Sequence, residues 1–559
     1  MTDDAETDGP DGAESTGRTR RHGTLVDWFD WGPTAFDRAR ARTEPVLLSL
    51  SAPWCVACEE MDDAVFSDPM LAAHVGEGFV PIRVDADRQP RVRERYNMGG
   101  FPSTVFTTPD GEIMTGATYL GPDGFRGILD SVRETWAAKG VEAGRVPRAL
   151  QDPDPPVGRV DASIEAHMVE QVAEAFDEEF GGWGESAKFP LARTVAFALK
   201  RDRDRATRTL EAIQAHLQDT YDGGFYRFAE NRDWAHPHRE KLLDENAALL
   251  RAFAAGYLYT GRDAYRETAE RTVDYLTTTL WTGDAFAGSQ AGGDYYTLEA
   301  TERADADPPH VDGTVFADRN GLASEALLRV AALTDAEAPR RYAARALDHV
   351  LETLVDDGVV SHFDAPESEA GLLLDHARLL AGLTTAVQVT GEERYLDSAV
   401  AVADELASLR APEGAFYDGP LEGEGLLTRP LRPLESNVEA ADALVDLAYL
   451  TGEGDGEYRE WAAEALSAFA GAADRMGAEV AGYAAACARH HYDPLVVETP
   501  PAGTALHRAA LRVADHEKVV VPDDRERAVV VRGGERSAPA ETPVELGERV
   551  ASADQPSVQ

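Results

Sequence analysis

The chain has 559 residues, which is too long for one ordinary hydrophobic core, so it should form two or three domains. Its formal net charge of −46 argues against nucleic acid as a partner, because the phosphates would be repelled. Apolar residues make up 43% of the chain, enough for a globular fold, but no run of about 18 of them predicts a membrane span.

Arginine supplies almost all of the positive charge. Among 54 basic residues the only lysines are Lys139, Lys188, Lys200, Lys241 and Lys518. An acidic, lysine-poor surface suits a cytoplasm at molar salt, where the Debye length falls to about 3 Å. A GC-rich genome would also replace lysine by arginine, but the excess of acid needs a separate explanation, so we favour a halophile. Three cysteines cannot build a structural disulfide framework, which fits a reducing cytoplasm.

Residues 1–22 are expected to be a disordered acidic tail, since the first residues lack the basic and apolar regions of a secretory signal. Residues 23–145 then read as an α/β domain. The expected elements are a helix at 33–42, a strand at 45–51, a helix opening near Cys55, a helix at 69–75, a strand at 79–84, a helix at 92–96, strands at 103–108 and 112–118, and a helix at 123–138. This order predicts an α/β sandwich.

Two of the three cysteines, Cys55 and Cys58, stand three residues apart directly after the apolar strand. Such a pair at a helix start can close a disulfide and exchange it with another thiol pair. A structural zinc site would need two more ligands, and no second Cys or His pair follows at finger-like spacing, so no metal is expected. The remaining alternative is a docking module whose cysteines are idle.

Residues 99–103, Gly-Gly-Phe-Pro-Ser, lie just before a strand, and the bond preceding Pro102 can be cis at a cost of about 0.5–1 kcal/mol. The segment resembles the cis-proline loop that faces the cysteines in thioredoxin folds. With residues 54–58 and 66–69, the domain resembles the thioredoxin-like domains of bacterial disulfide-reductase proteins. Cys55 would then be the attacking thiolate, its pKa lowered from about 8.5 toward 7 by the helix start, and Cys58 the resolving thiol.

A Pro-rich linker, 146–159, precedes a helical region at 160–487. Helical hairpins opening near residues 244, 318, 374 and 435 alternate with Gly-aromatic loops such as 180–184 and 222–226. This pattern predicts an (α/α)6 toroid whose inner helix starts converge on a cavity. Aromatic faces with carboxylates suit sugar binding. Alternatively, the loops only turn and pack.

The densest chemical cluster is residues 234–246, which supplies the candidate catalytic residues His238, Glu240 and Lys241. Lysine kept in a chain that prefers arginine indicates a need for a compact ammonium group. The expected substrate-binding residues are Glu185, Lys188, Asn246, Asp294 and Asn320.

Several motifs in one order resemble the spermatogenesis-associated, thioredoxin-domain family (YyaL-like proteins). They are Cys55/Cys58 with Met61 and Phe66, Asp85 with residues 88–90, residues 99–106, 181–190, 237–246 and 320–322. The resemblance implies a thioredoxin-like domain joined to a six-hairpin toroid related to N-acylglucosamine 2-epimerase and glycosidase folds. The chain departs from the family at Val56, Ala57 and Glu59 around the cysteines, and at Arg239 and Arg319 in the toroid.

Three functions remain open. The first is a cytoplasmic thiol–disulfide oxidoreductase acting on a protein disulfide or small thiol. The second is a carbohydrate-active enzyme, either an isomerase with His238 as base or a hydrolase with paired carboxylates such as Glu240 and Asp294. The third is a non-catalytic binding protein. No cofactor is expected, and residues 488–559 are expected to form a short β appendage and a disordered tail, with Cys487 buried before them.

Overall fold

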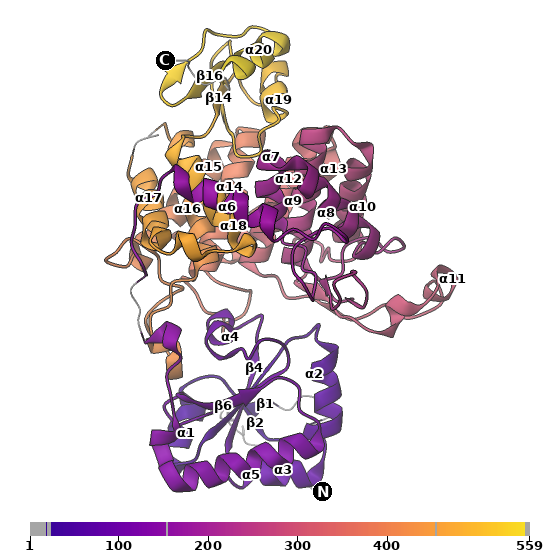
Figure 1. Cartoon of the computed structure of the whole chain (residues 1–559), viewed down its shortest axis with the longest axis vertical. Coiled ribbons are helices and arrows are strands. Elements are labelled where there is room, and N and C mark those ends of the chain that lie inside the picture. The colour runs from indigo at the N-terminus through magenta and orange to yellow at the C-terminus, as the bar shows by residue number, and fades with distance from the viewer. Residues whose placement is uncertain (1–17, 20–23, 152–154, 453–455, 554–559) are drawn as a thin grey trace, which may run out of the picture. The chain divides into compact units, whose positions relative to one another are not determined.

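The structure is a computed structural model that describes residues 18–19, 24–151, 155–452 and 456–553 (Figure 1). It divides into two compact units. The first is Met1–Arg148 with Leu421–Arg429, and the second is Ala149–Pro420 with Pro430–Gln559. The predicted tail at 1–22 lies outside the described residues apart from Arg18–Thr19, which form a short strand.

The first unit is built on a six-stranded sheet in the order β1-β2-β4-β3-β5-β6. The central strand β3 runs parallel to β4 and antiparallel to β5, with Leu48 opposite Ile82 on one side and Val105 on the other. The strands are β1 Arg18–Thr19, β2 Trp28–Asp30, β3 Val46–Ser51, β4 Val80–Asp85, β5 Ser103–Thr107 and β6 Ile113–Ala117. Every residue of β3 is buried because helices cover both faces of the sheet.

The helices of this unit follow the predicted order closely. They are α1 Pro33–Arg42, α2 Val56–Met61 continuing as a π-helical turn η1 Asp62–Phe66, α3 Pro69–Gly76, α4 Pro90–Tyr96 and α5 Pro122–Lys139. Proline opens four of them, where its missing N–H costs nothing. Asp68 caps α3 by accepting from the amides of Met70 and Leu71. The α/β thioredoxin-like fold is confirmed.

In the second unit, six inner helices form a closed ring. Contacts run from α7 to α9, α12, α14, α16 and α18 in turn, and from α18 back to α7. The inner helices are α7 Ala192–Arg201, α9 Leu243–Thr260, α12 Ala317–Thr334, α14 Leu373–Thr390, α16 Leu434–Leu450 and α18 Ala481–His491. At the closest crossing, Gly321 of α12 and Gly382 of α14 let the two backbones touch, since a Cβ at Gly382 would lie 2.8 Å from the Gly321 carbonyl oxygen.

A second layer of helices packs outside this ring (Figure 1). They are α6 Ala162–Glu174, α8 Arg203–His216, α10 Asp263–Thr278, α13 Glu337–Thr353, α15 Glu393–Glu405 and α17 Glu457–Ala470. The first of them, α6, packs on the last inner helix α18, so the two ends of the helical region close the sixth hairpin. The predicted (α/α)6 toroid is confirmed.

Short elements lie after α5 and in the loops of the second unit. They are η2 Gly140–Ala143, η3 Arg148–Leu150, β7 Phe228–Ala229, β8 Pro237–His238, β9 Lys241–Leu242, β10 Ser289–Gln290, η4 Asp294–Thr297, α11 Ala300–Arg303, β11 Val311–Asp312, β12 Val355–Asp356, β13 Val359–Val360, η5 Leu406–Leu409, η6 Gly425–Thr428, η7 Ala473–Arg475 and η8 Ala478–Val480. Among the described residues no helix is long and apolar enough to cross a membrane.

The C-terminal region corrects one expectation. Four strands, β14 Val496–Thr499, β15 Val519–Pro522, β16 Val529–Arg532 and β17 Glu535–Arg536, form a small sheet with helix α19 Ala505–Leu511. The expected disordered tail is instead helix α20 Pro543–Ala553, up to the last described residue. Leu546, Val550 and Ala553 recur at helical spacing and pack into the core of this appendage, which stabilises the helix.

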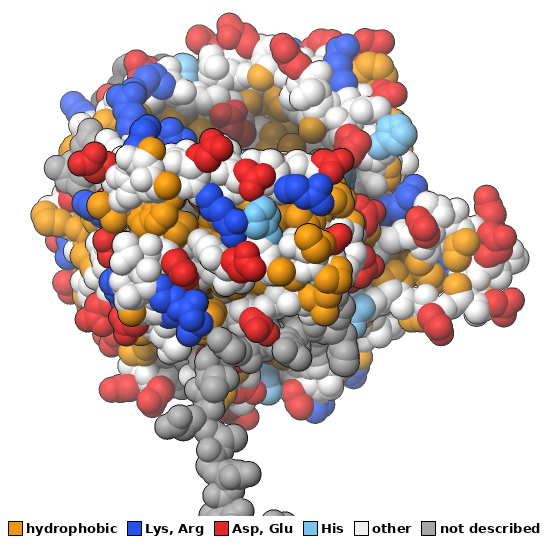
Figure 2. Space-filling model, turned by 90° about the horizontal axis from the view of Figure 1, so that it is seen from below, with side chains coloured by type: hydrophobic (Ala, Val, Ile, Leu, Met, Phe, Trp, Pro, Cys, Tyr) orange, Lys and Arg blue, Asp and Glu red, His pale blue; other side chains and the backbone are white. Residues whose placement is uncertain are grey.

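On the face shown in Figure 2, acidic side chains are scattered with basic ones between them. Charges of one sign do not gather there into an extended patch. Interspersed opposite charges limit self-repulsion on so acidic a chain.

One segment of the helical region, Leu421–Arg429, belongs to the first unit. The hydroxyl of Tyr96 donates to the carbonyl of Gly111 and accepts from the amide of Leu426, each at 2.9 Å. Arg95 donates to the carbonyls of Leu426 and Arg429 at 2.9 and 2.8 Å. Burial raises the pKa of the Tyr96 hydroxyl, so it stays protonated and keeps both roles.

We therefore expect Tyr96→Phe to loosen this attachment. The substitution leaves two buried backbone groups without their partner, at a cost of about 1–3 kcal/mol. Hydrogen exchange of peptides covering 421–429 should become faster. Tyr119→Phe is the matched control, because Tyr119 in the same unit is 43% exposed. Unchanged protection in the Tyr96 variant would contradict the assigned role.

Candidate functional site

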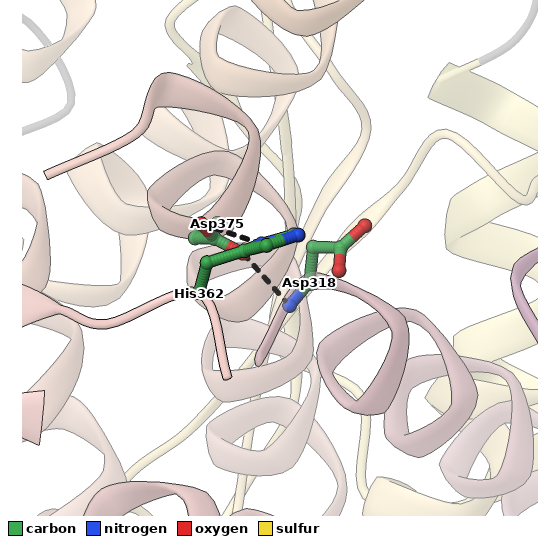
Figure 3. A group of neighbouring side chains, drawn as sticks. All are labelled: Asp318, His362 and Asp375. Carbon is green, nitrogen blue, oxygen red and sulfur yellow. Dashed lines mark hydrogen bonds and ion pairs between the residues drawn. The ribbon is translucent and has the colours of Figure 1, made fainter. Parts of the chain in front are cut away.

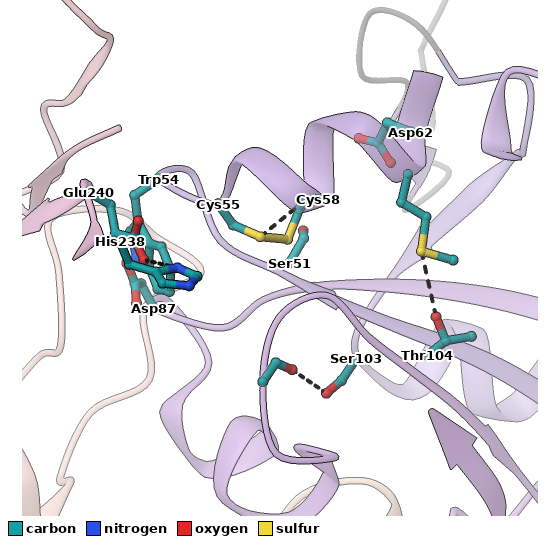
Figure 4. Close-up of a disulfide and its surroundings, with 12 residues drawn as sticks. Ser51, Trp54, Cys55, Cys58, Asp62, Asp87, Ser103, Thr104, His238 and Glu240 are labelled. Atoms are coloured by element: carbon teal, nitrogen blue, oxygen red, sulfur yellow. Dashed lines mark hydrogen bonds and ion pairs between the residues drawn. A yellow bond between two sulfur atoms is a disulfide. The ribbon is translucent and has the colours of Figure 1, made fainter. Parts of the chain in front are cut away.

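The two predicted redox cysteines are joined in the structure. Cys55 and Cys58 form a disulfide at the start of α2 (Figure 4). Cys55 is the N-cap residue, and its sulfur accepts from the backbone amide of Cys58 at 3.1 Å. An amide at a helix start that points at sulfur stabilises the thiolate once the bond is reduced.

The loop that carries the cysteines is fixed from two sides. The indole N–H of Trp54 donates to Asp87 at 2.8 Å, and its ring meets Phe101 edge-on. The Phe101–Pro102 peptide bond is cis, as expected for this loop. At the C-terminal end of α2, Arg83 of β4 donates to both carboxylate oxygens of Asp62, at 2.6 and 2.8 Å. These contacts hold the cysteine turn against the sheet.

The third cysteine, Cys487, lies buried on inner helix α18. Burial raises the pKa of its thiol to about 12. Burial and a weakly acidic thiol both disfavour the exposed thiolate that disulfide exchange requires.

In the toroid, two predicted site lysines have a structural role. Lys188 donates to Asp177 at 2.8 Å and to the Gly184 carbonyl, and its side chain has no exposed surface. Lys241 repeats this pattern with Asp219 at 2.8 Å and the carbonyl of Gly223. Because neither ammonium is exposed, this placement corrects the prediction that they meet substrate. The two ammonium groups instead stabilise the glycine-containing loops at residues 181–184 and 223–224.

The predicted substrate-binding asparagines are also fully buried. Asn246 accepts from the amide of Phe225 at 2.7 Å and donates to the carbonyls of Phe225 and Leu242. Asn320 makes the equivalent three bonds with Phe286 and Phe316. Both amide hydrogens are used by backbone in each case, so these side chains are backbone clamps, which corrects that prediction too.

His238 lies between two carboxylates. Its Nε2 is 3.0 Å from Glu230, its Nδ1 is 3.6 Å from Glu240, and its ring stacks on Phe228. Hydrogen bonding to Glu240 raises the pKa of His238, against the opposing effect of burial. Burial by itself would raise the pKa of Glu240, but His238 and Arg227 outweigh it and the net shift is downward.

Glu245, on the first turn of α9, is a residue that sequence reasoning missed. Its carboxylate is 3.3 Å from Nε of Arg227, whose Nη1 is 3.4 Å from Glu240. Burial raises the pKa of Glu245 to about 8, reinforced by Asp244 and opposed by Arg227. One arginine therefore holds two carboxyl groups whose pKa values are shifted in opposite directions. The sequence signal was the Asp-Glu pair opening the helix.

The other two predicted substrate-binding residues, Glu185 and Asp294, have no described contact with Glu240 or Glu245. Glu185 lines a separate surface cleft with Phe189 and Arg232. Asp294 is exposed at the first residue of η4, and among the described contacts none links it to Glu240. The expected pairing of Glu240 with Asp294 is thus not seen in the described residues.

Asp318, His362 and Asp375 form a buried group whose possible ligand atoms lie within 4.8 Å of one another, the one such group found among the described residues. Figure 3 shows the imidazole of His362 between the two aspartates. Its Nδ1 is 2.9 Å from Asp375, and Arg378 donates to Asp318 at 2.9 Å. The guanidinium already supplies positive charge to Asp318, so we assign the group to an ion-pair network rather than a metal centre.

The chain resembles known proteins in both parts. Residues 14–150 match the family Thioredox_DsbH, described as a protein of unknown function, DUF255. Spermatogenesis-associated protein 20 of Homo sapiens is 29% identical over 321 residues, 51% of this chain and 39% of that protein. Thiol:disulfide interchange protein DsbD 1 of Pseudomonas aeruginosa is 29% identical over 103 residues, 18% of this chain and 17% of that protein.

These matches confirm the predicted resemblance to spermatogenesis-associated, thioredoxin-domain proteins. The chain spans about two fifths of the length of the human relative. Among solved structures, a sugar epimerase from a ruminal bacterium has a TM-score of 0.45 at 13% identity, covering 56% of this chain and 86% of that one. Likeness at this level says nothing about what the toroid acts on.

The raised pKa of Glu245 predicts a pH-dependent stability. A carboxyl group whose folded pKa lies above its unfolded value stabilises the fold below about pH 4.5, and this contribution is lost as the pH rises through about 8. Glu245→Gln should therefore flatten the fall in Tm between pH 5 and 9. Glu267→Gln on outer helix α10, whose carboxyl is not in this group, is the control. Equal pH profiles for wild type and Glu245→Gln would refute the shift.

Proposed function

We propose that the protein is a thiol–disulfide oxidoreductase that works through Cys55 and Cys58. The observation that carries the proposal is the disulfide at the helix start, with the Cys58 amide directed at the Cys55 sulfur. The similarity of this region to thiol:disulfide interchange proteins supports it.

In the reduced protein, the Cys55 thiolate attacks a substrate disulfide. A Cys55–substrate mixed disulfide forms, and the first substrate sulfur leaves as a thiolate and takes up a proton. Cys58 then attacks the Cys55 sulfur and expels the second substrate thiol, so that the Cys55–Cys58 disulfide forms. Two electrons pass to the substrate, and an external dithiol must return them before the next cycle.

We place this activity in the cytoplasm of a salt-adapted cell. The net charge of −46 with only five lysines supports the halophile. Cys487, the one cysteine outside the redox pair, is a buried thiol, as suits a reducing compartment.

We infer a second, separate capability for the toroid, which is proton transfer to and from a carbohydrate. It rests on Glu240 and Glu245, since a pair of carboxyl groups with pKa values pushed apart is the arrangement used for a general base and a general acid. Glu245 here takes the place that sequence reasoning gave to Asp294.

For the redox function, we expect wild type to reduce insulin in the presence of dithiothreitol and Cys55→Ser to lose all activity above the uncatalysed rate. Cys58→Ser should retain the first attack and accumulate a mixed disulfide visible by mass spectrometry. Cys487→Ser is the control and should keep full activity. Activity in Cys55→Ser, or none in wild type at any salt concentration, would reject the proposal.

For the toroid, wild type should convert a member of a panel of reducing sugars and oligosaccharides. Glu240→Gln and Glu245→Gln should each lower kcat by about 10²–10⁴-fold, the usual contribution of a general acid or base. Asp294→Asn should act like wild type. Equal turnover in all three variants would show that this carboxyl pair is not catalytic.

A further inference from the structure

The centre of the toroid contains a cavity of ≈ 170 Å³ that ends beneath the segment joining α19 to β15. Every inner helix contributes a charged side chain to its wall: Arg193, Arg251, Arg329, Arg378, Asp446 and Arg489. A cavity so rich in arginine is unusual inside a helical ring, because charges are costly to bury without partners.

Most of this charge is neutralised locally. Arg378 donates to Glu439 at 2.9 Å, and Arg193 approaches the same carboxylate at 3.3 Å. On the neighbouring wall Arg489 pairs with Asp446. Arg193, Arg378 and Arg489, the guanidinium groups described in this part of the cavity, thus each have a carboxylate partner.

The wall formed by α9 and α12 differs, because two arginines share one carboxylate. Glu325 is 3.0 Å from Nη1 of Arg251 and 2.9 Å from Nε of Arg329. Among the described contacts Arg329 uses only its Nε for a hydrogen bond. Its two terminal nitrogens are thus available to a further acceptor.

Lys518 lines the same end of the cavity. The acidic residues beside it in sequence are already engaged, since Lys200 binds both Asp515 and Glu517 at 2.8 Å and Arg201 also binds Glu517. Within the described part of the chain, the ammonium of Lys518 donates only to the backbone carbonyl of Asp515, at 3.0 Å.

Lys518 is therefore exceptional among the four lysines of this unit. Lys188, Lys200 and Lys241 each have a carboxylate within ion-pair distance. No carboxylate in the described residues lies within that distance of Lys518. This half-buried amine has, among the described residues, no such counter-charge, whereas every other lysine of the toroid does.

The missing counter-charge affects the protonation of Lys518. Burial lowers the pKa of Lys518 to about 7, with Arg329 and Lys200 lowering it further and Asp515 opposing them. His516, which follows Asp515 and contacts the Tyr259 hydroxyl at 2.9 Å, does not add charge, because burial lowers its pKa to about 4. Near neutral pH the amine is thus only partly protonated.

We propose that the end of the toroid cavity bounded by Arg329 and Lys518 is a binding site for a small oxyanion. The terminal N–H groups of Arg329 offer a forked pair of donors, and the Lys518 ammonium offers a point charge, which is the donor set that carboxylates and phosphates take. The anion supplies the missing counter-charge. The site uses no cysteine and lies outside the Glu240–Glu245 pair.

Binding is linked to protonation of Lys518. An anion next to the amine favours its charged form, so each binding event above pH 7 takes up as much as one proton. Affinity should then fall by about tenfold for each pH unit above the free-state pKa, and should be independent of pH well below it.

Calorimetric titration of the full chain with sulfate tests the site, because sulfate does not change its own protonation between pH 5.5 and 8.5. Titrations at constant ionic strength in two buffers of different ionisation enthalpy measure proton uptake. We expect saturable binding, close to one proton taken up at pH 8.5, and none at pH 5.5. Non-saturable binding, or saturable binding without proton uptake at pH 8.5, would overturn the proposal.

Two variants test the contribution of each residue. Lys518→Met should abolish the proton uptake and weaken binding at pH 6 at least tenfold. Arg329→Gln should weaken binding at pH 6 and, because Arg329 lowers the pKa of Lys518, should shift the proton uptake to higher pH. Lys139→Met, in the other unit, should match wild type. Sulfate affinity and proton linkage that persist unchanged in Lys518→Met would refute the assignment.

Chemical modification of the wild-type protein tests the same site without a substitution that could prevent folding. At pH 7.5 the partly neutral Lys518 should be acetylated by an amine-reactive ester, and sulfate should slow this modification while Lys139 reacts at an unchanged rate. Protection by inorganic phosphate identifies a tetrahedral anion as the ligand class, and protection by acetate identifies a carboxylate. Protection by neither sulfate nor the other two would contradict the site.

Discussion

The fold of the toroid depends on how its loops satisfy their backbone groups beside the buried starts of the inner helices. Asn246, Asn320 and Asn437 each bind the amide and carbonyl of an aromatic residue in the preceding loop, and a carbonyl four residues back on their own helix. A buried N–H or C=O without a partner costs about 1–3 kcal/mol. The repeated asparagine therefore fixes the preceding loop to the start of three of the six inner helices, α9, α12 and α16.

Site residues could be predicted from the sequence where their role depends on local order along the chain. The strand–cysteine–helix order is local, so Cys55, Cys58 and the elements around them were predicted nearly residue by residue. In a sequence, a buried asparagine or lysine that binds backbone groups cannot be told from one that binds substrate. The prediction that Asn246 and Lys241 contact substrate is therefore wrong. Strand β2 is only three residues long, and the attachment of Leu421–Arg429 to α4 joins residues some 330 positions apart, beyond any local pattern. The hairpin of α6 and α18 was missed for the same reason.

The protonation of a side chain depends on the charges next to it and not on the net charge of the chain. The chain has 100 acidic and 54 basic residues, yet Lys518 has no described carboxylate partner. Exposed acids elsewhere do not compensate a half-buried amine, because water and salt screen their charge over about 10 Å. Local pairing therefore decides protonation, and net charge predicts only solubility and the choice of environment.

The sulfur chemistry and the toroid chemistry use separate residues but not separate chains. The backbone crosses between the two units at residues 148–149, 420–421 and 429–430. A fragment cut at residue 148 would keep both redox cysteines. It would lose the Leu426 amide that donates to Tyr96 and the Leu427 and Leu426 carbonyls that accept from Arg91 and Arg95. Those side chains would then be buried polar groups without partners, or would become solvated by local unfolding next to the cis-proline loop. The thioredoxin-like unit is thus completed by residues 421–429, a segment that the helical region supplies.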